Sequence, residues 1–140
     1  MPDNAPLTLG IDHVGLAVKN LESTRRFFCE CLGWKVVGER PNYPAAFVSD
    51  GNAIVTLWQV EDPESCVAFD RRRNIGLHHL ALKVVDRGAL ESLHARVAAW
   101  PGTSIEFAPE RSGTGPKVHF MIREPGGNRI EFACVSPAAG

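Results

Sequence analysis

The stretch His-Val-Gly-Leu-Ala-Val at residues 13–18 returns in altered form as His-Leu-Ala-Leu-Lys-Val at residues 79–84. Both stretches alternate branched apolar residues with small or polar ones, a pattern that predicts a β-strand with one buried face. The branched residues would pack against the core, whereas each histidine would share the opposite face with small residues. The chain is therefore predicted to contain an internal repeat, and each copy begins with a histidine-bearing strand.

A third alternating stretch, Arg-Ile-Glu-Phe-Ala-Cys at residues 129–134, places Glu131 on the sparse face of a strand beside a small alanine. Two imidazoles and one carboxylate are suitable ligands for a divalent ion. Small neighbours on the same faces would leave room for a ligand. His13, His79 and Glu131 therefore form the predicted metal site.

The rest of each half supports the repeat. Asn20 can cap a helix over residues 21–32 that ends at Gly33, and Asp86 can cap a helix that Pro101 and Gly102 end. The predicted strands are residues 10–18, 34–39, 45–49 and 53–60 in the first half, and 78–84, 104–108, 117–123 and 129–135 in the second. Each half is thus a β-α-β-β-β module, and the fold class is α+β.

The two modules, residues 9–60 and 77–136, are joined by a polar linker at residues 61–76 within one predicted domain, residues 1–140. A chain of this length can bury one ordinary core. Residues 109–116, rich in glycine and proline, are predicted to form a mobile loop beside the site.

The bulk composition narrows the class of function. The formal net charge of −1 does not indicate nucleic-acid binding, and no apolar run is long enough for a membrane span. The first residues lack the basic and apolar regions of a signal peptide, so we expect a cytoplasmic protein. The four cysteines fit no disulfide or zinc spacing and are interpreted as reduced thiols.

Four segments resemble the vicinal oxygen chelate superfamily, which includes glyoxalase I, fosfomycin and bleomycin resistance proteins and extradiol dioxygenases. They are Ile-Asp-His-Val-Gly-Leu-Ala-Val at 11–18, Phe-Phe-Cys-Glu-Cys-Leu-Gly-Trp at 27–34, Leu-His-His-Leu-Ala-Leu at 77–82 and Arg-Glu-Pro-Gly-Gly-Asn-Arg-Ile-Glu-Phe at 123–132. Glu124 stands in the last segment where an aspartate is more usual. The resemblance covers about residues 9–136 and implies two paired modules whose sheets curl into a cup around a divalent ion.

Residue by residue, the resemblance places His13, His79 and Glu131 at three ligand positions of this family. A fourth ligand, usually a glutamate on the last strand of the first module, is missing here. Strand spacing puts Thr56 at that position and the alignment of the turns puts Val55 there, with Thr56 favoured. The metal, whether iron, nickel, zinc or manganese, would therefore keep open coordination positions for a chelating substrate.

Several other side chains are candidates for the same site. Glu131 and His119 could transfer protons, and Arg111, Trp58, Phe107 and Phe120 could contact a substrate. His78 is expected on the face opposite to His79, because adjacent strand residues alternate.

Three functions follow from the resemblance. The first is a glyoxalase-like lyase or isomerase acting on a small molecule that chelates the metal through adjacent oxygens. The second is an Fe(II)-dependent extradiol-type dioxygenase, and the third is a non-catalytic binding protein of the bleomycin-resistance type. The family also implies a homodimer, with the cup formed within one chain or between two.

Overall fold

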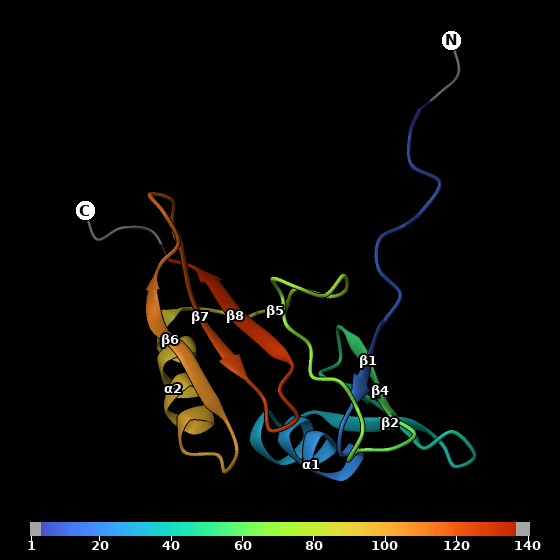
Figure 1. The fold of residues 1–140 in the computed structure, drawn as a ribbon. Coiled ribbons are helices and arrows are strands. Elements are labelled where there is room, and N and C mark those ends of the chain that lie inside the picture. The colour runs from blue at the N-terminus through green and yellow to red at the C-terminus, as the bar shows by residue number, and fades with distance from the viewer. Residues whose placement is uncertain (1–3, 137–140) are drawn as a thin grey trace.

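The computed structural model describes residues 4–136 and contains two four-stranded sheets (Figure 1). The first sheet has the order β1-β4-β3-β2 and the second the order β5-β8-β7-β6. Their strands are β1 (Val14–Val18), β2 (Lys35–Arg40), β3 (Ala45–Ser49), β4 (Ile54–Gln59), β5 (Leu80–Lys83), β6 (Ser104–Arg111), β7 (Lys117–Arg123) and β8 (Arg129–Val135). This confirms the predicted repeat and the α+β class; residues 1–3 and 137–140 of the predicted domain lie outside the described residues.

The two sheets share one register. In the first, β1 pairs with β4 in parallel and Gly15 stands opposite Thr56; in the second, β5 pairs with β8 in parallel and Ala81 stands opposite Glu131. Thr56 is therefore the counterpart of Glu131. Val55 instead faces the core and is 1% exposed, so the register favours Thr56 over Val55 as the equivalent of the family's fourth ligand position.

The helices begin where the sequence indicates. The Asn20 side chain accepts a hydrogen bond from the Ser23 backbone N–H at the start of α1 (Leu21–Arg26), and Asp86 caps α2 (Arg87–Ala98) through Ala89. The first helix was expected to be α-helical to residue 32, but it widens into a π-helical stretch, η1 (Phe27–Cys31), before Gly33 ends it with a positive φ. Among the described residues, no helix has the length and apolar character needed to cross a membrane.

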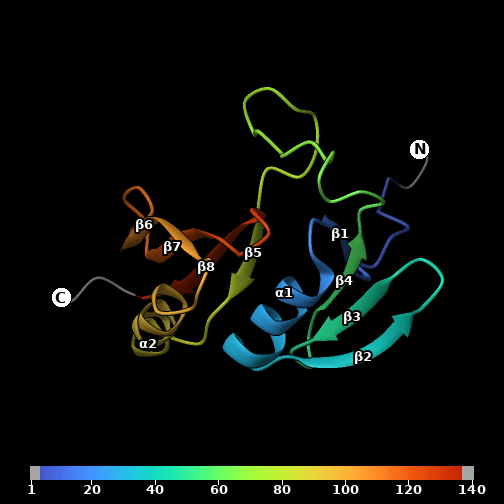
Figure 2. The same ribbon diagram turned by 60° about the horizontal axis from the view of Figure 1, so that its bottom comes forward.

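One hydrophobic core joins the two halves. Phe27 and Phe28 of η1 and Leu90 of α2 are fully buried with Phe120 and Phe132 of the second sheet. Both helices lie on the same side of the molecule (Figure 2). Burial of each of these side chains stabilises the fold by about 1.5–3 kcal/mol. Because both helices pack on this side, the opposite faces of the sheets are free of helices.

The strand boundaries that differ most from the prediction are the starts of β1 and β5 and the end of β6. β1 begins at Val14 and β5 at Leu80, so His13 and His79 lie just before their strands. β6 continues to Arg111, which leaves a shorter loop than residues 109–116. Pro109 indicated a break, but β6 is an edge strand, where proline is tolerated, and its register with β7 shifts between Phe107 and Glu110.

Candidate metal and substrate site

Glu131 lies between two histidine rings on the helix-free face of the second sheet. Its Oε1 atom is 3.7 Å from Nε2 of His79 and 3.4 Å from Nδ1 of His119, and the glutamate is 8% exposed. Atoms that bind one ion at about 2.1 Å lie roughly 3.0–3.4 Å apart. The structure thus brings two of the predicted ligands, His79 and Glu131, near each other and adds His119; we call these three residues the Glu131 cluster.

His119 contributes a buried nitrogen atom without a partner. Its Nδ1 has no hydrogen bond in the described residues, although the ring lies near Glu131. Buried polar atoms are almost always paired in folded proteins. A divalent ion or a substrate proton would satisfy this nitrogen atom. His79 and Glu131 are two donors of the kind that the family resemblance implies for a divalent ion.

His13 does not join the cluster in this chain. Its Nδ1 lies 2.7 Å from a carboxylate oxygen of Asp12, and half of its side chain is exposed. Within residues 4–136, no three histidine, cysteine or acidic side chains are arranged to hold a metal ion. The segment before β1 runs away from both sheets (Figure 1), and its Leu7, Leu9 and Ile11 are almost fully exposed.

His78 lies against His79, although strand alternation predicted that the two side chains would point to opposite faces. The two Nδ1 atoms are 2.8 Å apart, and the rings meet edge to face. The expectation was wrong because β5 begins only at Leu80, so the backbone at His78 does not follow the strand alternation. Desolvation, then Arg129, lowers the pKa of His78 below its ordinary value.

A cavity of about 510 Å³ opens beside Glu131. Ala81 and Ala133 of the small-residue face line it together with Leu82, Val84 and Cys134 of the packing face. Lys83 and Lys117 also line it, and both are exposed. This volume suits a small ligand, and the two ammonium groups favour an anionic one.

Lys83 and Lys117 were not among the predicted site residues, although their spacing along the strands indicated which face they occupy. Lys83 lies two residues after Ala81 in β5, and Lys117 lies two residues before His119 in β7. Alternation therefore puts both on the face of the Glu131 cluster.

The corresponding face of the first sheet is covered by aromatic rings. Trp58 donates a hydrogen bond from Nε1 to the hydroxyl of Thr56 over 2.9 Å, and its ring packs against Tyr43 and Phe47. A Cβ atom on Gly15 would lie 3.1 Å from the Thr56 hydroxyl, so this strand position has little room for a side chain. The first sheet therefore presents an aromatic wall where the second presents ionisable groups.

The remaining predicted substrate contacts separate into two groups. Phe107 is half-buried with its ring centroid 4.9 Å from that of His119, so it lies beside the Glu131 cluster. Phe120 instead stacks on Phe132 in the core, because alternation in β7 turns it away from His119. Arg111 donates a hydrogen bond to the Ser136 carbonyl oxygen and does not line the cavity beside Glu131.

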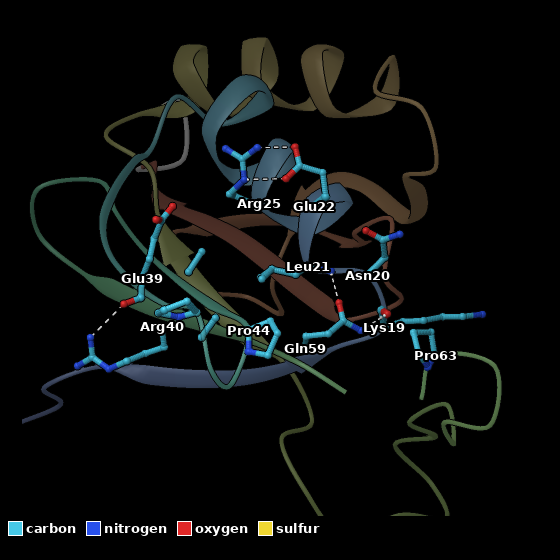
Figure 3. A pocket seen from close by; sticks show the side chains of 13 residues that line it. Lys19, Asn20, Leu21, Glu22, Arg25, Glu39, Arg40, Pro44, Gln59 and Pro63 are labelled. Atoms are coloured by element: carbon cyan, nitrogen blue, oxygen red, sulfur yellow. Dashed lines mark hydrogen bonds and ion pairs between the residues drawn. The ribbon is translucent and has the colours of Figure 1, made fainter. Parts of the chain in front are cut away.

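A second hollow of about 570 Å³ lies between the start of α1 and the ends of β2, β3 and β4 (Figure 3). Several of its polar groups already have partners. Arg25 binds Glu22, Arg40 donates to the Glu39 carbonyl oxygen, and Gln59 accepts from the Leu21 backbone N–H. Among the described residues, none of the Glu131 cluster lines this hollow, so it is separate from the candidate site.

Arg129 is held firmly at the other side of His78. Its Nε and Nη2 atoms donate to the two carboxylate oxygens of Glu106, each over 2.8 Å. These hydrogen bonds, with those of Arg123, lower the pKa of Glu106 to about 2. The Glu106 carboxylate is therefore ionised at neutral pH.

Comparison with known proteins identifies the family of this fold. Residues 10–132 match the model of the Glyoxalase/Bleomycin resistance protein/Dioxygenase superfamily. A catechol-2,3-dioxygenase of Bacillus subtilis (strain 168) is 28% identical over 128 residues, which are 89% of this chain and 42% of the relative. The chain thus spans less than half the length of this curated relative.

Solved structures repeat the same fold. A glyoxylase/bleomycin resistance protein/dioxygenase domain from Frankia sp. EAN1pec has a TM-score of 0.79 at 23% identity, covering 94% of this chain and 96% of its own. A lactoylglutathione lyase from Agrobacterium tumefaciens has a TM-score of 0.67 at 21% identity, covering 92% and 96%. A fosfomycin resistance protein from Listeria monocytogenes has a TM-score of 0.71 at 14% identity, covering 93% and 96%.

Proposed function

Because the chain belongs to the Glyoxalase/Bleomycin resistance protein/Dioxygenase superfamily, we propose that it is a metal-dependent lyase or isomerase whose small anionic substrate carries two adjacent oxygen atoms. The observation that supports this most is Glu131, which lies between nitrogen atoms of His79 and His119 at the wall of a cavity. A divalent ion there, whether iron, nickel, zinc or manganese, would supply Lewis-acid polarisation of the substrate oxygens.

The proposed roles follow from position and chemistry. His79 and Glu131 would hold the ion, with His13 as the third ligand. His119, whose buried Nδ1 has no partner among the described residues, accepts and returns a proton at the substrate carbon next to the polarised oxygen. Lys83 and Lys117 bind the anionic end of the substrate at the rim of the cavity.

His13 would reach this site from a second copy of the chain in a homodimer. In one chain His13 is paired with Asp12 and is not grouped with the Glu131 cluster. The exposed Leu7, Leu9 and Ile11 lead directly to it. Apolar side chains at alternate positions of an extended segment suit burial against a partner sheet.

A mixing experiment tests the shared site. His13→Ala and His79→Ala are purified separately, and each homodimer should lack one ligand at both sites and bind zinc weakly. In a re-equilibrated mixture, heterodimers should regain one intact site, which zinc titration detects as recovered high-affinity binding. If mixing restores nothing although subunit exchange occurs, the ligands come from one chain and the shared site is wrong.

A second candidate function is an Fe(II)-dependent dioxygenase. Thr56 is the counterpart of Glu131, at the position where the resemblance implies a glutamate as the fourth ligand. Two histidines and one carboxylate would therefore leave positions of an iron ion open for dioxygen beside a substrate. The relative from Bacillus subtilis bears the name catechol-2,3-dioxygenase. Oxygen consumption by iron-loaded protein with catechols, absent with the nickel- or zinc-loaded protein, would favour this function over the lyase or isomerase.

Metal content separates both enzymes from the third possibility, a binding protein of the bleomycin-resistance type. Elemental analysis of protein purified without a histidine tag should find about one divalent ion per chain. Protein that carries no ion and gains none on dialysis against nickel, zinc, manganese or iron would contradict the proposed enzyme.

A further inference from the structure

A chain of contacts runs from Glu106 through Arg129 and His78 to His79. Arg129 is held by both carboxylate oxygens of Glu106, and its side chain is 8% exposed. Its third nitrogen, Nη1, donates to the His78 carbonyl oxygen over 3.0 Å and lies 3.1 Å from the Nδ1 of His78. The guanidinium group is thereby fixed against His78.

The direction of each hydrogen bond in this chain follows from the arginine. A guanidinium group has only donors and stays charged in proteins. The contact between Arg129 Nη1 and the Nδ1 of His78 therefore favours a lone pair, and not a hydrogen atom, on this nitrogen. The same nitrogen lies 2.8 Å from the Nδ1 of His79, and a lone pair there favours a hydrogen atom on the His79 nitrogen, which shares that lone pair with Arg129.

The position of this hydrogen atom decides which nitrogen of His79 has a lone pair. A neutral imidazole with hydrogen on Nδ1 has a free lone pair on Nε2. That atom is 3.7 Å from Glu131 Oε1, too far for a hydrogen bond. The other tautomer, with hydrogen on Nε2, would present no lone pair on the side of Glu131.

We propose that Glu106, Arg129 and His78 are positioning residues that hold His79 in the tautomer with a free Nε2 lone pair aimed at Glu131. The functional role of the free lone pair rests on the proposed metal site. The tautomer itself can be measured in the metal-free protein. Outer residues of this kind orient metal-binding histidines, and their loss typically lowers affinity 10- to 100-fold.

The direct test is the nitrogen chemical-shift pattern of His79 in metal-free, ¹⁵N-histidine-labelled protein at a pH where the ring is neutral. The wild type should show hydrogen on Nδ1. His78→Ala removes the acceptor and should move the population towards hydrogen on Nε2. His78→Asn keeps an oxygen acceptor near the position of Nδ1 and should restore the wild-type pattern.

A matched control comes from Arg123, which also donates to Glu106, over 3.1 Å, but makes no contact with His78 in the part of the chain that the structure describes. Arg123→Met should leave the His79 pattern unchanged, whereas Arg129→Met should shift it as His78→Ala does. Zinc affinity should fall about 10-fold in His78→Ala and return to within about 3-fold in His78→Asn.

The outcomes separate this inference from the proposed function. A wild-type His79 with hydrogen on Nε2, or a pattern unchanged in His78→Ala, overturns the inference even if zinc binds tightly. The expected pattern without any zinc binding supports the inference and contradicts the metal site. If His78→Ala and His78→Asn both lose zinc as completely as His79→Ala, His78 is itself a ligand and the positioning role is wrong.

Discussion

The hydroxyl of Thr24 donates a hydrogen bond to the carboxylate of Glu124 over 2.8 Å, between residues that lie 100 positions apart in the chain. Both side chains are buried. The other carboxylate oxygen accepts from the backbone and side-chain nitrogen atoms of Asn128. This contact joins α1 of the first half to the β7–β8 turn of the second, so it fixes how the two sheets face each other.

Replacing Thr24 should therefore destabilise the whole chain. Thr24→Val keeps the shape but leaves a buried carboxylate short of a donor, and we expect a loss of about 1–3 kcal/mol in the free energy of unfolding, measured in urea. Thr103→Val is the matched control, because the buried Thr103 hydroxyl has no partner in the described residues and its removal should cost nothing. Equal losses in the two variants would argue against the role of the Thr24 contact.

His79→Ala should abolish high-affinity metal binding while the protein stays folded, because the ring lies in an open site and a third of it is exposed. Isothermal titration with zinc measures the binding, and circular dichroism checks the fold. His94→Gln, on α2 and against the core face of Phe120, is the control and should bind like the wild type. Wild-type affinity in His79→Ala would remove the proposed site.

Introducing a carboxylate at two neighbouring positions of the first sheet should change metal affinity at one position and stability at the other. Thr56→Glu places the group at the counterpart of Glu131, within reach of the Trp58 indole N–H, and should tighten metal binding. Val55→Glu buries an unpaired carboxyl group in the core and should cost several kcal/mol in urea unfolding. If the Thr56→Glu protein folds but does not bind metal more tightly, Thr56 is not the fourth ligand position.

The Glu106 carboxylate should contribute stability that depends on pH. Its folded pKa of about 2 lies below the ordinary value of 4.5, so the unfolded state binds more protons between these values. The contribution is complete above about pH 4.5 and is lost as the pH falls through about 2. The melting temperature of Glu106→Gln should therefore fall less than that of the wild type over this range; identical pH profiles would contradict the assignment.

The alternation of the sequence was sufficient to predict that Leu16, Val18, Ile130 and Phe132 pack in the core, because each sheet packs one face against the helices. It also brought His79 and Glu131 to the same face. Alternation failed at His78, which precedes β5, and the loop predicted at Arg111 is in part an edge strand. The relation of His13 to the cluster could not be predicted, since it depends on how whole sheets are placed, and no local pattern encodes that.

The shared register of the two sheets has a consequence for how such a protein can change over time. At one structural position the second half carries the acid Glu131, and the first carries Thr56 under the ring of Trp58. Under the proposed function, the second half would supply the reactive groups and the first half an aromatic surface. Replacements among Trp58, Tyr43 and Phe47 would then change that surface while His79, His119 and Glu131 stay the same, so selectivity could evolve separately from the chemistry.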